Sequence, residues 1–220
     1  MKIDILTLFP NMYSGFLEES IISRAINKKI VSINIVDIRD FSHLNNKQVD
    51  DTPYGGGAGM VLRIEPLYEA LMSVKDDDAL VILLTPDGEV YKQDKAKELS
   101  RYKHLIFICG HYEGFDERIR NFVDLEISIG DYILTGGELA SMVISDSIIR
   151  LIDGVITKDS LDEESFNDKM LDYPTYTKPR EYKGMEVPPV LISGDHKKIQ
   201  EWRNEMRLKR TKERRPDLLK

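Results

Sequence analysis

The stretch LIFICGHYEGFDERIRNFVDLEISIGDYILTGGELASMVISDSIIR, residues 105–150, is the part of this chain that indicates most about its fold and its candidate site. It opens with an apolar run, residues 105–109, that stops at Gly110 in the way a buried strand stops at a loop. Two further glycine-bounded turns come after it, one at Gly130 and one at Gly136-Gly137. Buried apolar segments therefore alternate with three turns whose backbone is exposed.

The segment after the third turn predicts an amphipathic helix. Thr135 and Glu138 stand three residues apart ahead of apolar residues at helical spacing, which is the pattern of a capping box. Because glycine has no side chain and tolerates backbone angles that other residues avoid, the three turns can hold a flat ligand against the main chain. Glycines that only separate strands from a helix would give the same pattern, so this stretch alone leaves both interpretations open.

Apolar runs alternate with amphipathic segments through the rest of the N-terminal region. We expect strands near residues 2–8, 31–38 and 79–84, and helices near residues 11–29, 65–74 and 94–102. This alternation predicts an α/β fold with a mostly parallel sheet that helices cover on both faces. Such sheets bind ligands beyond the carboxyl ends of their strands. Thr85-Pro86-Asp87-Gly88 and Gly110 both follow such ends.

The composition changes after the first predicted domain, residues 1–153. Residues 154–168 are rich in acidic side chains and carry no long apolar pattern, which predicts a flexible linker. A small helical domain is expected at residues 169–220, with Asp195 as the cap of its helix and Trp202 as its core anchor.

The net charge of −7 is unevenly distributed along the chain. From residue 197 to the end, ten Lys or Arg residues face four Asp or Glu residues, a balance of +6 that leaves −13 on the first 196 residues. A basic tail suits contact with nucleic-acid phosphates, although a solvated helix face can also be basic. Since no segment approaches the roughly 18 apolar residues that span a bilayer, we expect a cytoplasmic protein without a membrane partner.

Several common chemistries do not fit the sequence. The glycine-rich loop YGGGAGM, residues 54–60, lacks the Gly-Lys-Ser/Thr end of a P-loop, and it lacks the third glycine and the preceding strand of a dinucleotide fingerprint. The single cysteine, Cys109, excludes an intrachain disulfide and is interpreted as a packed structural thiol. No two histidines have metal-ligand spacing, so no metal site is predicted. The histidines are His43, His104, His111 and His196.

Four longer motifs carry a family resemblance. They are VDDTPYGGGAGM at residues 49–60, CGHYEGFDERI at 109–119, SIGDYILTGGELA at 128–140 and SGDHKKIQEWR at 193–203. In this order, and over nearly the whole chain, they resemble the bacterial tRNA (guanine-N1)-methyltransferase family, TrmD, of the SPOUT superfamily. The resemblance implies a trefoil-knot cofactor site, with methyl transfer from S-adenosylmethionine to N1 of guanosine 37 in tRNA. It also implies a homodimer whose active site lies at the subunit interface, with RNA rather than DNA as the partner.

The resemblance also assigns residues to the two ligands. Those assigned to the cofactor are Thr85, Pro86, Gly110, Tyr112, Glu113, Ile129, Gly130, Asp131, Tyr132, Ile133, Leu134, Gly136 and Gly137. Those assigned to the RNA are Arg24, Asp50, Tyr54, Gly55 and Lys178, together with the basic tail. His111 is interpreted as lining the cofactor pocket rather than acting as a base.

Two residues are assigned to the reaction itself. Glu164, just before Ser165-Phe166, matches the carboxylate that serves as general base, and the adjacent Asp162 and Glu163 remain alternatives. Arg150 matches the arginine that stabilises the purine oxygen, although a cation at a helix C-terminus also has a purely electrostatic explanation. The family's magnesium ion would arrive with the RNA. A related methyltransferase of ribosomal RNA and a non-catalytic RNA-binding regulator are the alternative functions.

Overall fold

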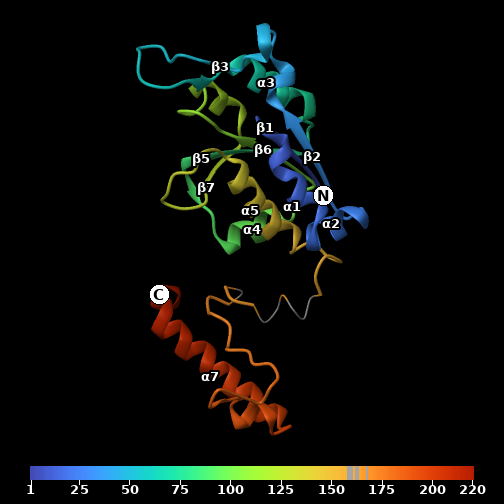
Figure 1. Cartoon of the computed structure of the whole chain (residues 1–220), viewed down its shortest axis with the longest axis vertical. Helices are drawn as coiled ribbons and strands as arrows, with labels where there is room; N and C mark the ends of the chain where they lie inside the picture. Colours follow the sequence, from blue (N-terminus) through green and yellow to red (C-terminus); the bar gives the residue numbers. More distant parts are fainter. Residues whose placement is uncertain (158–160, 162–163, 167) are drawn as a thin grey trace. The chain divides into compact units, whose positions relative to one another are not determined.

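The computed structural model describes residues 1–157, 161, 164–166 and 168–220. The chain forms two compact units, Met1–Ile156 and Thr157–Lys220 (Figure 1). Within the described residues, no helix combines the length and the apolar character needed to cross a membrane.

The first unit is built on a five-stranded sheet with the order β2-β1-β6-β5-β7, and all its strand pairs are parallel. The strands are β1 (Lys2–Thr7), β2 (Ser32–Asp37), β5 (Ala79–Val90), β6 (His104–Cys109) and β7 (Leu125–Ser128). Every residue of β6 is buried, as expected for a central strand that is covered on both faces. The predicted α/β class with a parallel sheet is confirmed.

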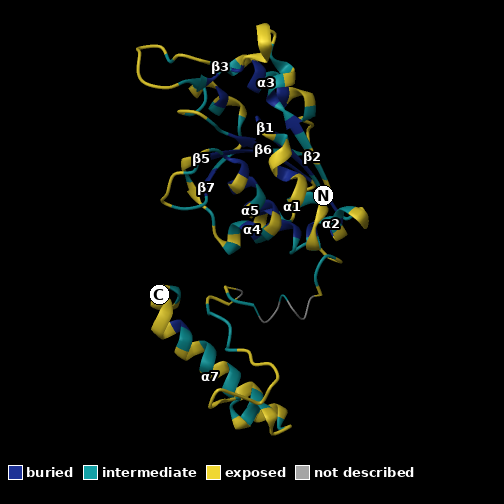
Figure 2. Cartoon of the chain, in the orientation of Figure 1, coloured by how far each residue is buried: buried dark blue, intermediate teal, exposed yellow. Residues whose placement is uncertain are grey.

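Helices cover the two faces of this sheet and enclose two apolar cores (Figure 2). Successive strand residues point to opposite faces, so Phe107 joins the core beneath α2, α4 and α5, whereas Ile106 joins the core beneath α3. The helices are α1 (Ser14–Glu18), α2 (Ser20–Asn27), α3 (Ile64–Val74), α4 (Gln93–Leu99) and α5 (Glu138–Ile149). Short 3-10 turns are η1 (Pro10–Tyr13), η2 (Ile38–Phe41), η3 (Asn45–Lys47) and η4 (Glu117–Phe122).

Two local expectations were wrong. The helix predicted near residues 11–29 is interrupted after Glu18, because Glu19 is extended and Ser20, the first residue of α2, takes a left-handed φ of 59°. The strand that Thr85-Pro86-Asp87-Gly88 was expected to stop continues to Val90. Ile127 of β7 pairs with Leu84 and again with Glu89, so the turn-forming residues bulge out of a strand that then resumes.

The second unit contains one long helix, α7 (His196–Arg214). Asp195 caps it as predicted, because its carboxylate accepts a hydrogen bond from the backbone N–H of Lys198 at 3.2 Å. The buried residue of this helix is Thr211 rather than Trp202, which is only partly buried. The other elements among the described residues of this unit are β8 (Glu181–Tyr182), β9 (Met185–Glu186), η5 (Pro189–Ile192) and η6 (Pro216–Leu219).

Candidate active site

A cavity of about 280 Å³ in the first unit brings the three glycine-bounded turns together. It lies at the carboxyl ends of three neighbouring parallel strands, where Leu84 ends the first part of β5, Gly110 follows β6 and Ser128 ends β7. Its walls come from four segments, residues 84–86, 110–115, 127–130 and 132–137, with Ala140 of α5. This is the end of a parallel sheet at which ligands bind.

Every residue that the resemblance assigns to the cofactor lines this cavity, except Asp131. His111 lines it as well. The cavity also contains apolar wall residues that the motifs did not single out, among them Phe115, Ile127 and Ala140. Ile127 lies in an apolar segment of the sequence just before the second turn, and this signal would have found it. The position of Phe115 depends on how the loop after β6 folds back.

The first and third turns are in direct contact. The N–H of Gly137 donates a hydrogen bond to the carbonyl oxygen of Gly110 at 3.0 Å, and His111 forms a β-bridge with Gly136. A Cβ atom on residue 137 would lie 2.7 Å from the Cα of Cys109, closer than real Cβ atoms approach. The close approach of two backbones therefore requires glycine at position 137. Its backbone conformation does not, because a φ of −80° suits any residue.

The predicted capping box is wrong. The N-cap of α5 is Gly137 rather than Thr135, and the helix start has no side-chain capping hydrogen bond. Glu138 is buried, and its carboxylate instead accepts a hydrogen bond from the hydroxyl of Thr7 at 2.7 Å. A buried carboxylate needs a hydrogen-bond donor, since an unpaired buried charge costs several kcal/mol. This bond joins the end of β1 to the start of α5, directly after the third turn.

The Thr85 turn is held by a chain of polar contacts. The hydroxyl of Thr85 donates to Asp87, whose carboxylate also pairs with the guanidinium of Arg120 at 2.8 Å. The hydrogen bond from Thr85, with the nearby charge of Arg120, lowers the pKa of Asp87 below its ordinary value. Arg120 also pairs with Glu126 of β7 and lies over the ring of Phe115 at 5.4 Å. The Thr85 turn is thus tied to the strand and to the loop that form two other walls of the cavity.

Two features of the loop after β6 are typical of a binding site. Tyr112 has a left-handed φ of 61°, a conformation that costs a tyrosine free energy and is concentrated at functional sites. The Nδ1 atom of His111 is buried and has no hydrogen-bond partner within the described part of the chain. Its ring packs against Phe9 at 4.7 Å and Tyr112 at 4.9 Å, which orients the imidazole. A polar ligand in the cavity would meet the main chain of these turns and the ring of His111.

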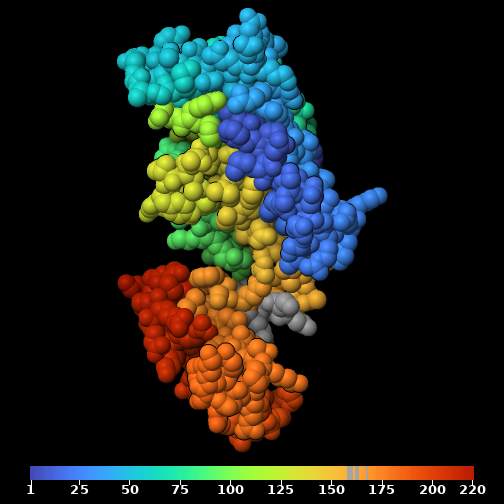
Figure 3. Space-filling model, viewed as in Figure 1, coloured from blue at the N-terminus to red at the C-terminus, as the bar shows by residue number. Residues whose placement is uncertain are grey.

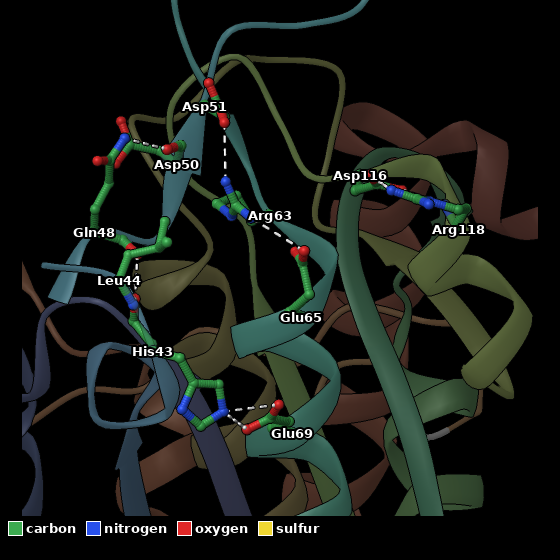
Figure 4. Close-up of polar contacts among 11 residues, drawn as sticks. His43, Leu44, Gln48, Asp50, Asp51, Arg63, Glu65, Glu69, Asp116 and Arg118 are labelled. Carbon is green, nitrogen blue, oxygen red and sulfur yellow. Dashed lines mark hydrogen bonds and ion pairs between the residues drawn. The ribbon is translucent and has the colours of Figure 1, made fainter.

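The loop assigned to the substrate lies between β3 (Asp50–Asp51) and β4 (Val61–Leu62). Tyr54 and Gly55 are exposed at this loop. The base of the loop is fixed by Arg63, which pairs with Asp51 at 2.9 Å and Glu65 at 3.1 Å (Figure 4). Asp50, the residue assigned to RNA, accepts a hydrogen bond through its backbone carbonyl from Gln48. This loop is connected to the cavity wall, because the N–H of Glu113 donates to the carbonyl of Met60 at 3.0 Å.

The remaining assigned residues fall in both units. Arg24 is exposed on α2, and its side chain donates to the carbonyl of Ser20 at 3.3 Å. Arg150 is the partly buried C-cap of α5. Glu164 and the exposed Lys178 belong to the second unit. Asp162 and Glu163, the alternative carboxylates, lie outside the described residues.

Known proteins resemble this chain over its full length. The family model described as tRNA (Guanine-1)-methyltransferase TrmD matches residues 1–220. A protein of Mycoplasmopsis agalactiae is 57% identical over 220 residues, which cover 100% of this chain and 97% of the relative. One from Carboxydothermus hydrogenoformans is 55% identical, covering 100% of this chain and 88% of the relative. One from Malacoplasma penetrans is 55% identical, covering 99% and 96%. All three relatives carry the name tRNA (guanine-N(1)-)-methyltransferase.

Proposed function

The chain belongs to the TrmD family of tRNA (guanine-N1)-methyltransferases, and from this premise we propose that it transfers a methyl group from S-adenosylmethionine to N1 of guanosine 37 in tRNA. The observation that supports the proposal most is that the three glycine-bounded turns, which all lie within family motifs, converge on one cavity at the carboxyl end of the sheet, together with the Thr85 turn. We propose a trefoil knot as the topology of this region, in line with the superfamily.

The cavity fits the proposed cofactor in its chemistry. Gly110, Gly130 and Gly136 bring main chain to the wall of the cavity, where backbone groups can recognise the edge of an adenine. The ring of His111 lines the same cavity. Ile127 and Ala140 supply apolar wall. S-adenosylmethionine supplies an electrophilic methyl group on a sulfonium.

The reaction requires the N1 proton of guanine to leave, because the nitrogen's electrons are otherwise delocalised in the ring amide. We propose that the carboxylate of Glu164 accepts this proton as N1 takes the methyl group and the sulfonium becomes a thioether. Arg150 would then face the guanine oxygen, which gains negative charge when the proton is lost. A general base of this kind contributes a factor of roughly 10²–10⁴.

We further propose the assembly in which this chemistry takes place. The active form is a cytoplasmic homodimer with its active site at the subunit interface. Residues 1–153 hold the cofactor, residues 154–168 form a linker that carries the base, and residues 169–220 bind tRNA. Arg24, Lys178 and the loop of Asp50, Tyr54 and Gly55 contact the RNA, and magnesium enters with the RNA.

Glu164→Gln tests the assignment of the base. We expect the rate of methyl transfer to fall by at least about a hundredfold, with affinity for S-adenosylmethionine nearly unchanged. Glu186→Gln, at an exposed position of the same unit, is the matched control and keeps full activity. If Glu164→Gln methylates normally, the base lies elsewhere, and Asp162→Asn and Glu163→Gln made in parallel would identify it.

The target is tested by labelling. Purified protein is incubated with labelled S-adenosylmethionine and a tRNA transcript, and the modified nucleotide is mapped. We expect label on N1 of guanosine 37 and none on a transcript with adenosine at that position. Label on another nucleotide, or on ribosomal RNA alone, would refute the proposal that guanosine 37 of tRNA is the target. Binding of RNA without any transfer would favour the regulatory alternative.

A further inference from the structure

We propose that the second unit has a binding pocket of its own, which takes an unstacked base of the RNA substrate. The pocket lies entirely within residues 173–203 and has a volume of about 460 Å³. The inference rests on the proposed function in one respect only, since it takes RNA to be the ligand of this unit.

Two pieces of the chain form the pocket. One wall is the segment from Tyr173 to Tyr176, and the other is one face of α7, with a contribution from Leu191 of η5. The residues of α7 that line it are His196, Ile199, Gln200 and Arg203, at the i, i+3, i+4 and i+7 positions that share a helix face. Figure 3 shows the chain that precedes α7 lying against this helix, in orange and red.

The pocket offers flat groups for stacking. Tyr176 is 49% exposed, so part of its side chain is open to a ligand. The guanidinium of Arg203 lies over the ring of Tyr173 at 4.6 Å. These two planar groups also line the pocket. Proteins recognise single-stranded RNA by stacking its bases on aromatic rings and arginine planes.

The pocket also offers groups that read the edge of a base. Gln200 carries an amide with both a donor and an acceptor, and its nitrogen lies 3.3 Å from the side-chain oxygen of Asn204, which orients the amide. His196 adds a ring that can donate or accept. A base carries donors and acceptors in its plane and none above it, which is the combination that tyrosine faces and a glutamine amide match.

The charge around the pocket favours a polyanion. Lys178 lies two residues after the pocket segment, and Lys197 lies between lining residues of α7; both are exposed. The helix and its end carry the +6 balance of residues 197–220. Phosphates that flank a captured base would therefore meet positive charge on this unit.

The test uses the full-length protein and the tRNA transcript. Dissociation constants are measured by filter binding at several salt concentrations for wild type, Tyr176→Ala and Gln200→Ala. Tyr176→Ala should weaken binding by about ten- to a hundredfold without changing the slope of affinity against salt, because stacking releases no counterions. Tyr182→Ala, at an exposed tyrosine of the same unit outside the pocket, is the matched control and should bind like wild type.

Trp202 gives a second readout, because it is the single tryptophan and its ring lies 6.4 Å from that of Tyr176. We expect the transcript to quench Trp202 fluorescence in wild type and in Tyr182→Ala, and to quench it less in Gln200→Ala. Gln200 is an exposed helix residue, so its replacement by alanine preserves the fold.

The outcomes separate this inference from the proposed function. It is overturned if Tyr176→Ala and Gln200→Ala bind the transcript as tightly as Tyr182→Ala. It is also overturned if their loss of affinity comes with a shallower salt slope, since that would indicate a phosphate contact. Wild-type methylation of the same transcript is measured separately. Absence of transfer would refute the proposed function and leave the pocket's role intact if the binding results hold.

Discussion

Replacing Gly137 by alanine would disturb the contact that joins the first and third turns of the cavity. The new Cβ would lie 2.7 Å from the Cα of Cys109 and 3.1 Å from both the Cβ of Cys109 and the N of Gly110. Cβ atoms essentially never come within 3.0 Å of such atoms, so the two backbones must separate by at least 0.3 Å. Both sides of the closest contact are main chain, which cannot move away as a flexible side chain can.

The size of the effect is the sum of three contributions. Overpacking of this kind costs about 1–3 kcal/mol. Loss of the hydrogen bond from Gly137 to Gly110 costs a further ~0.5–1.5 kcal/mol. Alanine lowers the conformational entropy of the unfolded chain, which stabilises the folded state by about 0.4–1 kcal/mol. The free energy of unfolding should therefore fall by roughly 0.5–4 kcal/mol. Affinity for S-adenosylmethionine should fall at least about tenfold, because the wall of its proposed site has moved.

Gly15→Ala is the matched control. Gly15 lies on α1, and a Cβ there would meet nothing within 4 Å, so this variant should gain about 0.5–1 kcal/mol and bind the cofactor normally. Urea unfolding measures the stabilities, and isothermal titration calorimetry with S-adenosylmethionine measures the affinities. If Gly137→Ala binds the cofactor as tightly as Gly15→Ala, the cavity formed by these turns is not the cofactor site.

Two further predictions concern titratable groups. Burial raises the pKa of Cys109 to about 12, so its thiol should react with an aromatic disulfide at pH 8 only as fast as the protein unfolds. Denatured protein should release one equivalent of the aromatic thiol at once. Rapid labelling of the native protein would contradict the burial of Cys109. The ion pair with Nδ1 of the buried His104, at 2.9 Å, lowers the pKa of Asp76 below its ordinary 3.8. The carboxylate of Asp76 therefore stabilises the fold above that pH, and this stabilisation is lost as the pH falls through the lower folded-state pKa. Urea midpoints should show Asp76→Asn to be less stable than wild type at pH 6, with the difference shrinking below about pH 3.8. The neighbouring exposed Asp77→Asn should show no such dependence, and a pH-independent difference for Asp76→Asn would refute the ion pair.

Much of the fold depends on local patterns in the chain. The apolar runs of β1, β5 and β6 were recognised because a strand buried on both faces must be apolar at successive positions. Since parallel strands end at the same edge of a sheet, the turns at Thr85 and Gly110 were expected to lie together, and they do. Asp195 was recognised as a cap from its own side chain and the residues just after it.

Other features depended on partners distant in sequence. Glu138 matched a capping box, yet its carboxylate binds Thr7, which is 131 positions away and is brought to it by the packing of α5 on the sheet. The strand β5 continues beyond its turn signal because Ile127 of β7 offers backbone groups to Glu89. In the second unit, Tyr173 meets Arg203 only because the segment before α7 folds back along that helix.

By itself, therefore, the sequence determined the class of the fold, the order of its strands and helices along the chain, and the three turns at which backbone is exposed. These properties depend on residues within a few positions of one another, through side-chain period and glycine's freedom. The tertiary structure alone decided which donor satisfies each buried charge, where a strand resumes after a bulge, and which aromatic and cationic groups share a pocket. Those choices depend on contacts between distant segments, whose free energies are settled only when the whole unit has packed.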